Sequence, residues 1–114
     1  MTRMVSYVVS SCVVALGLGI AAPAWAQDAK AGEKLFVDQK CSVCHSIAGK
    51  GNVKGPLDDV GSRLPAADLS AWLTDAKAMT VKTKAPRKPE MKAYTLEKNE
   101  VDALVAYLLT LKKK

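Results

Sequence analysis

The segment Cys41–His45 (CSVCH) constrains this chain more than any other feature, because a histidine directly follows two cysteines spaced three positions apart. Cysteines at this spacing lie on one side of a helical turn. Their thiols can form thioethers with the two vinyl groups of one haem, and the following imidazole can bind the iron. The motif therefore predicts one covalently bound haem c, attached through Cys41 and Cys44, with His45 as an axial ligand.

Two other chemistries use cysteines at this spacing. A thioredoxin-like redox pair belongs to a βαβ unit, and the sequence has no strand pattern. A structural zinc site takes four Cys or His ligands, whereas only two cysteines and one histidine follow residue 26. Haem attachment is the interpretation that fits both the order and the number of these side chains.

Residues 1–26 have the composition of an export signal. Arg3 precedes a mostly apolar run, and the small residues at and before Ala26 suit a signal peptidase. Cleavage there leaves one domain, residues 27–114, in the periplasm. Two alternatives stay open: an uncleaved membrane anchor, because the run is long enough to span a bilayer, and a lipoprotein acylated at Cys12. Each alternative exports the domain.

The remaining chain shows helical periodicity alone, which predicts an all-α fold without strands. The expected helices cover residues 28–40, 66–78 and 96–111. Asp28 and Thr95 are the expected N-caps of the first and last helix. Irregular, lysine-rich stretches at residues 46–57 and 79–95 separate the helices.

The second axial ligand is expected from a methionine. The chain has no second histidine, and Met79 and Met91 are the two methionines after the predicted signal. Met79 falls at the predicted end of the middle helix, where a core position is the alternative. Met91 follows Pro89 in a loop that can cover the open face of a haem. Met91 is therefore the preferred ligand, and a lysine or an open position remains an alternative.

Three further residues are candidates for haem contacts. The turn at Pro56 can fix a carbonyl that orients the histidine ring, although an ordinary turn explains it equally well. The indole N–H of Trp72 and the guanidinium of Arg63 can bind haem propionates. As alternatives, Trp72 is a core residue and Arg63 faces water.

The order of these features resembles that of small, single-haem, bacterial class I c-type cytochromes across the whole of residues 27–114. The resemblance implies the cytochrome c fold, in which the N- and C-terminal helices cross over a covalent haem. The positions that match this helix crossing are Gly32, Phe36, Leu104 and Tyr107. The resemblance also implies that the Pro56 carbonyl orients His45 and that Met91 is the distal ligand.

An iron with two protein ligands has no free site for a substrate, which favours electron transfer over catalysis. The expected function is therefore a periplasmic electron carrier that cycles between Fe(II) and Fe(III) and is not an enzyme. One alternative is a haem subunit of a larger membrane-bound respiratory complex. Another is a ligand-binding haem sensor, although the chain offers no distal histidine.

The charge of the chain bears on its partners. The formal net charge is +6. Five basic residues lie in the irregular stretch 79–95 around Met91, which we call the methionine loop: Lys82, Lys84, Arg87, Lys88 and Lys92. If these residues form a basic rim around the haem, we expect redox partner proteins with an acidic docking face. The equal alternative is a loop whose charges are only solvated. We expect no nucleic-acid partner, because no nucleic-acid motif is present. We expect a monomer that meets the membrane only if residues 1–26 are retained.

Overall fold

The structure, a computed structural model, describes residues 17, 19 and 24–113 of the chain. Most of the predicted export segment therefore lies outside the described residues. The described part of the chain contains no helix that is both long enough and apolar enough to cross a membrane.

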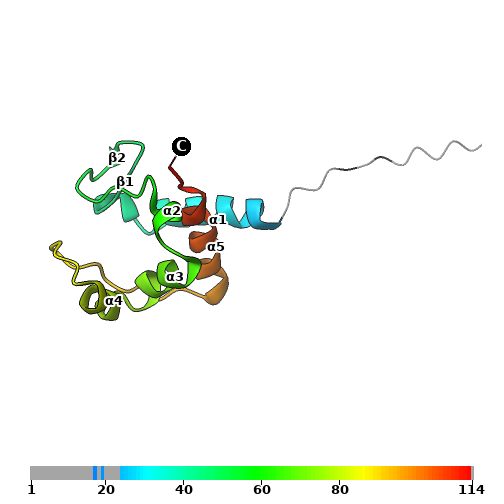
Figure 1. The fold of residues 1–114 in the computed structure, drawn as a ribbon. Helices are drawn as coiled ribbons and strands as arrows, with labels where there is room; N and C mark the ends of the chain where they lie inside the picture. Colours follow the sequence, from blue (N-terminus) through cyan, green and yellow to red (C-terminus); the bar gives the residue numbers. More distant parts are fainter. Residues whose placement is uncertain (1–16, 18, 20–23, 114) are drawn as a thin grey trace, which may run out of the picture.

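Two crossing helices form the largest packing contact in the described residues. They are α1 (Ala24–Asp38) and α5 (Lys98–Thr110), drawn in cyan and red in Figure 1. Gly32 lies at their closest approach: a methyl group there would overlap the carbonyl of Ala103 and come within 2.7 Å of the Tyr107 Cβ. Phe36 and Tyr107 make an edge-to-face contact beside it, with ring centroids 5.8 Å apart. The predicted helix crossing is confirmed, and it explains the glycine within α1.

One hydrophobic core lies beneath this crossing. Its buried members come from α1, α2 (Val60–Arg63), α3 (Ala66–Thr74) and α5. They are Phe36, Val60, Leu69, Leu73, Val101, Leu104, Val105 and Leu108. The short helix α2 is tied to the end of α5, because the Gly61 amide donates to the Leu111 carbonyl at 2.8 Å. Burial of these apolar side chains is the main favourable term that holds the four helices together.

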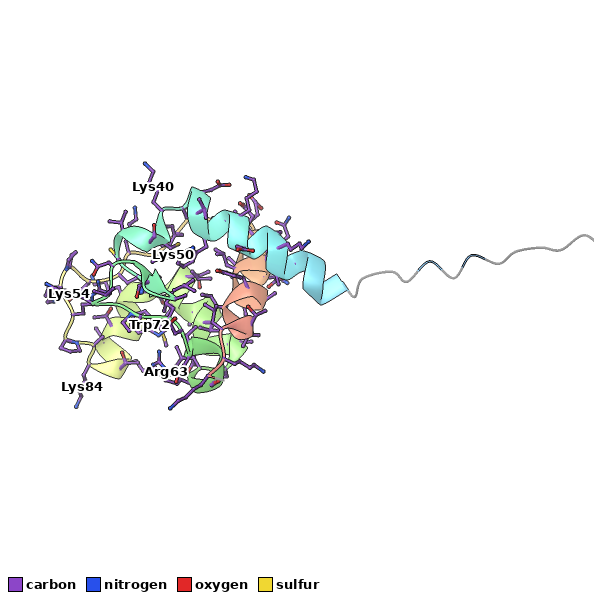
Figure 2. All side chains as sticks on the ribbon, turned by 90° about the horizontal axis from the view of Figure 1, so that it is seen from above. Lys40, Lys50, Lys54, Arg63, Trp72 and Lys84 are labelled. Atoms are coloured by element: carbon purple, nitrogen blue, oxygen red, sulfur yellow. The ribbon has the colours of Figure 1, made fainter. Side chains whose placement is uncertain are left out.

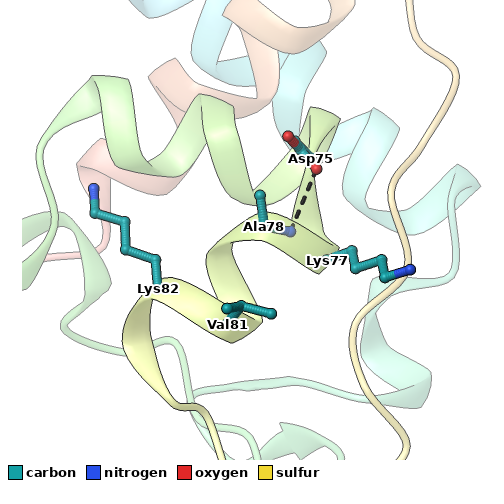
Figure 3. A pocket seen from close by; sticks show the side chains of 5 residues that line it. All are labelled: Asp75, Lys77, Ala78, Val81 and Lys82. Carbon is teal, nitrogen blue, oxygen red and sulfur yellow. Dashed lines mark hydrogen bonds between the residues drawn. The ribbon is translucent and has the colours of Figure 1, made fainter.

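The predicted middle helix, residues 66–78, is wrong as a single element. The chain forms α3 and then α4 (Ala76–Thr83), with a break at Asp75. The Asp75 backbone leaves the helical region, and its carboxylate accepts from the Ala78 amide at 3.4 Å (Figure 3). Aspartate favours such a capping position over a helix interior. The methionine loop therefore begins at Lys84 rather than at Met79.

Both predicted N-caps are also corrected. α1 begins at Ala24, so Asp28 lies inside the helix. α5 begins after Glu97, and its side chain and that of Glu100 form a reciprocal capping box. Because that box satisfies backbone amides at the start of α5, the helix begins after Glu97 rather than after Thr95.

A small hairpin follows the cysteine motif. Residues Cys41–Val43 form a 3-10 helix, η1, and β1 (Ser46–Ile47) pairs antiparallel with β2 (Lys50–Gly51). In Figure 1 this hairpin extends beyond the C-terminal end of α1. Strands of two residues are too short to show an alternating pattern, which is why the sequence predicted none. The expectation of an essentially helical domain holds for the rest of the described chain.

Candidate cofactor site

The predicted ligands line one cavity of about 890 Å³. Cys41, Cys44, His45 and Met91 all contribute to its wall. Much of the remaining wall is apolar, including Phe36, Leu57, Leu69, Leu73, Leu104 and Leu108. Ligand cavities in proteins are typically about 300–1,000 Å³ and mostly apolar. The size, the apolar wall and the set of two thiols, one imidazole and one thioether all fit a haem c.

The two cysteines are presented by η1. Lys40, two residues after the end of α1, adopts a left-handed conformation with φ of 56°, and the chain then turns through η1. The amides of Cys44 and His45 both donate to the Cys41 carbonyl, at 3.1 and 2.9 Å. Neither thiol is in a disulfide, and burial raises the pKa of the Cys41 thiol. The tight turn therefore brings both free thiols to one wall, as the spacing predicts.

His45 is half-buried and its ring is fixed by one hydrogen bond. Its Nδ1 lies 3.0 Å from the Gly55 carbonyl oxygen. A carbonyl can only accept, so Nδ1 carries the proton and Nε2 is the nitrogen available to a metal. Burial lowers the pKa of His45, the hydrogen bond to Gly55 opposes this, and the charge of Arg87 adds to it. The ring is therefore held in the neutral form that binds metals.

The acceptor is Gly55, and the expectation of the Pro56 carbonyl is wrong. The Ser46 amide donates to the Gly55 carbonyl at 3.1 Å, and the Leu57 amide donates to the Ser46 carbonyl at 2.9 Å. These bonds form a parallel bridge between Ser46 and Pro56. The bridge turns the carbonyl before the proline toward His45. Pro56 is exposed and supports the site through the backbone alone.

The two methionines differ in position. Met91 is half-buried, packs against the core and lines the cavity. Met79 is buried in α4, with 5% of its surface exposed, and does not line the cavity. The loop that carries Met91 is pinned to α3, because the Tyr94 amide donates to the Leu73 carbonyl at 2.8 Å. This arrangement supports Met91 as the ligand and a core position for Met79.

The structure brings both proposed propionate contacts to the cavity. Trp72 on α3 is half-buried, and Arg63 stands in the last turn of α2. In Figure 2 Trp72 lies near the centre of the molecule and Arg63 nearer its edge. The Nε of Arg63 lies 3.5 Å from an Asp59 carboxylate oxygen, and the Arg63 side chain is 56% exposed. Binding of a propionate by either residue stays a prediction.

The basic residues at the cavity differ from the predicted set. Arg87, Lys88 and Lys92 line it, as do two lysines that the sequence did not single out, Lys40 and Lys54. Lys82 instead lines a shallow depression on α4, beside Asp75 and Val81 (Figure 3), and Lys84 caps that helix. Lys40 directly precedes the motif and Lys54 follows it nine residues later, but nothing local predicts that they line the same cavity as the methionine loop.

Comparison with known proteins adds independent information. The family model described as Cytochrome c matches residues 29–112. Cytochrome c oxidase subunit 2 of Alkalihalophilus pseudofirmus is 29% identical, over 74% of this chain and 26% of that protein. The chain thus spans about a quarter of the length of this relative. No solved structure matches the chain.

Proposed function

Because this chain belongs to the cytochrome c family, we propose that it is an exported electron carrier whose haem iron is ligated by His45 and Met91. The family establishes haem c bound through Cys41 and Cys44, and it establishes haem-based electron transfer. When bound, the haem supplies an iron that alternates between Fe(II) and Fe(III). The observation that carries the proposal is that both cysteines and both ligand candidates line one cavity.

Each residue has a distinct part in this proposal. His45 offers a neutral Nε2, because Gly55 holds its other nitrogen at 3.0 Å. Met91 offers a thioether, which favours the reduced iron relative to a second nitrogen ligand. The apolar wall around Leu104, which is 1% exposed, excludes water from the site. With both axial positions filled, the site is suited to electron transfer and not to binding a substrate.

Ligation is tested by reduced-minus-oxidised spectra of the holoprotein with Met91→Leu and, as matched control, Met79→Leu. Leucine conserves volume and cannot ligate iron, so neither change leaves a large hole. We expect the low-spin His/Met features to be lost in Met91→Leu alone. Retention of those features in Met91→Leu would reject Met91 as the ligand.

We further propose that the partner is acidic at its docking face. The lysines and arginines at the cavity come from four separate segments, namely Lys40, Lys54, Arg63 and the group Arg87, Lys88 and Lys92. In Figure 2 Lys40 and Lys54 project outward from the molecule. Among the described residues, Glu90 is the one acidic residue that lines the cavity, and it is paired with Lys88. An excess of positive charge at the mouth speeds encounters with an acidic protein.

A second candidate function is a haem subunit of a larger respiratory complex. The similarity to a cytochrome c oxidase subunit supports it. The two candidates differ in how the protein is recovered from cells. N-terminal sequencing that begins at Gln27, with the protein in the periplasmic fraction, supports the carrier. A retained N-terminal segment and co-purification with membrane proteins supports the subunit.

A further inference from the structure

The loop between α4 and α5 reaches the cavity at two functionally different points. Met91 lines the cavity, and four residues earlier Arg87 is half-buried and lines it too. The Arg87 guanidinium lies against Gly55: a methyl group on that glycine would overlap one of its nitrogens and come within 2.8 Å of its Cζ. The same methyl group would lie 2.4 Å from the carbonyl oxygen of Cys44. Arg87 thus connects the methionine loop to the cysteine motif.

Gly55 is the residue that orients His45. Its carbonyl accepts from His45 Nδ1 at 3.0 Å and from the Ser46 amide at 3.1 Å. The guanidinium and the Cys44 backbone carbonyl fill the space that a side chain would take at position 55, so glycine is needed for this close approach. A planar guanidinium and the compact ammonium of a lysine differ in shape, so a lysine does not reproduce this contact. Arg87 therefore restricts the movement of Gly55, whose carbonyl holds the His45 ring.

The charge of Arg87 acts on the same ring. Arginine stays protonated at every accessible pH, and its guanidinium lies against Gly55, whose carbonyl holds the His45 ring. The other lysine and arginine side chains at the cavity are exposed, whereas Arg87 is half-buried. A charge partly removed from water acts more strongly on its neighbours. Because Fe(III) carries one more positive charge than Fe(II), a nearby cation favours Fe(II).

We propose that Arg87 is a positioning residue of the haem site, which holds the Gly55 carbonyl behind His45 and favours the Fe(II) state of the iron. This inference rests on the proposed function, because it requires His45 to bind the iron. The electron that reduces Fe(III) comes from a redox partner protein, and the step needs no proton. Arg87 itself does not change its charge.

The charge effect is tested by equilibrium redox titration of holoproteins at high salt. Arg87→Gln removes the charge, Arg87→Lys keeps it, and Lys30→Gln removes one charge from the exposed face of α1 as a matched control. For Arg87→Gln we expect the Fe(II):Fe(III) ratio at fixed potential to fall at least threefold. This is about 28 mV, since tenfold is about 59 mV for one electron. Arg87→Lys and Lys30→Gln are expected to change the ratio less than threefold.

The positioning effect is tested by NMR exchange of the His45 Nδ1 proton in the same holoproteins. We expect at least threefold faster exchange in both Arg87→Gln and Arg87→Lys, because neither side chain reproduces the contact of the guanidinium with Gly55. The control Lys30→Gln should exchange at the wild-type rate. Faster exchange in Arg87→Lys with a nearly unchanged potential separates the two effects and supports both.

Three results overturn the inference in different ways. If Arg87→Gln has the same Fe(II):Fe(III) ratio and the same His45 Nδ1 proton exchange rate as Lys30→Gln, Arg87 has no role at the site. If the Fe(II):Fe(III) ratio of Arg87→Gln falls while its His45 Nδ1 proton exchanges at the wild-type rate, the positioning role is refuted. If the wild-type spectrum shows an iron without His45 ligation, the proposed function fails first and this inference fails with it.

Discussion

Gly32 is the position where a single methyl group most directly tests the helix crossing. In Gly32→Ala the new Cβ would overlap the Ala103 carbonyl, and it would lie 2.6 Å from that carbonyl carbon and 2.7 Å from the Tyr107 Cβ. Two of these three atoms belong to the backbone of α5, so no side-chain rotation relieves the clash. The two helices must separate for alanine to fit.

The magnitude follows from opposing terms. Alanine in place of glycine inside a helix stabilises by about 1 kcal/mol. Overpacking a close contact costs about 1–3 kcal/mol, and the upper end applies because backbone atoms are involved. Separating the helices also weakens the contact of Phe36 with Tyr107, which is worth about 1 kcal/mol beyond burial. The net loss is about 3 kcal/mol, a large share of the roughly 5–15 kcal/mol of a typical domain.

The assay is urea unfolding of the holoprotein, followed by circular dichroism at constant pH. We expect the midpoint to fall while the slope stays unchanged, as a change of stability alone requires. Ala31→Gly is the matched control, because Ala31 is exposed on the same helix and reports helix propensity by itself. If Gly32→Ala is as stable as the wild type or more so, α1 and α5 do not approach as closely as described.

Three further outcomes can be measured. Leu104→Ala removes a core side chain that is 1% exposed, so the unfolding free energy should fall by about 2–5 kcal/mol; a loss below about 1 kcal/mol would contradict its place in the core. Lys40→Glu with Lys54→Glu should slow partner association at low salt by roughly tenfold, and Lys30→Glu far less, in stopped-flow experiments; equal effects would refute steering at the cavity. Burial lowers the pKa of His45 from its ordinary 6.5, so below that pH the unfolded chain binds more protons than the folded protein. The contribution of His45 to stability is therefore full above pH 6.5 and falls as the pH drops below it; a urea midpoint that rises when the pH is lowered from 7.5 to 5.5 would contradict the lowered pKa.

The sequence alone determined the chemistry of the site. Cys41–His45 predicts thioether attachment because two vinyl groups require two thiols at a fixed spacing, and this depends on local geometry. The lack of any other histidine limits the second ligand to a methionine or a weaker candidate. The periodicity of residues 96–111 predicts a helix because an apolar stripe at helical spacing must be buried. These predictions use neighbours along the chain, which the sequence shows directly.

The tertiary structure decided how the segments meet. The bridge at Ser46 makes Gly55 rather than Pro56 the acceptor for His45. In the same way, Arg87 reaches Gly55 from a loop that is remote in the sequence. Each outcome depends on hydrogen bonds and packing between distant residues. No local preference encodes such contacts, because their energy exists only after the chain has folded around its core.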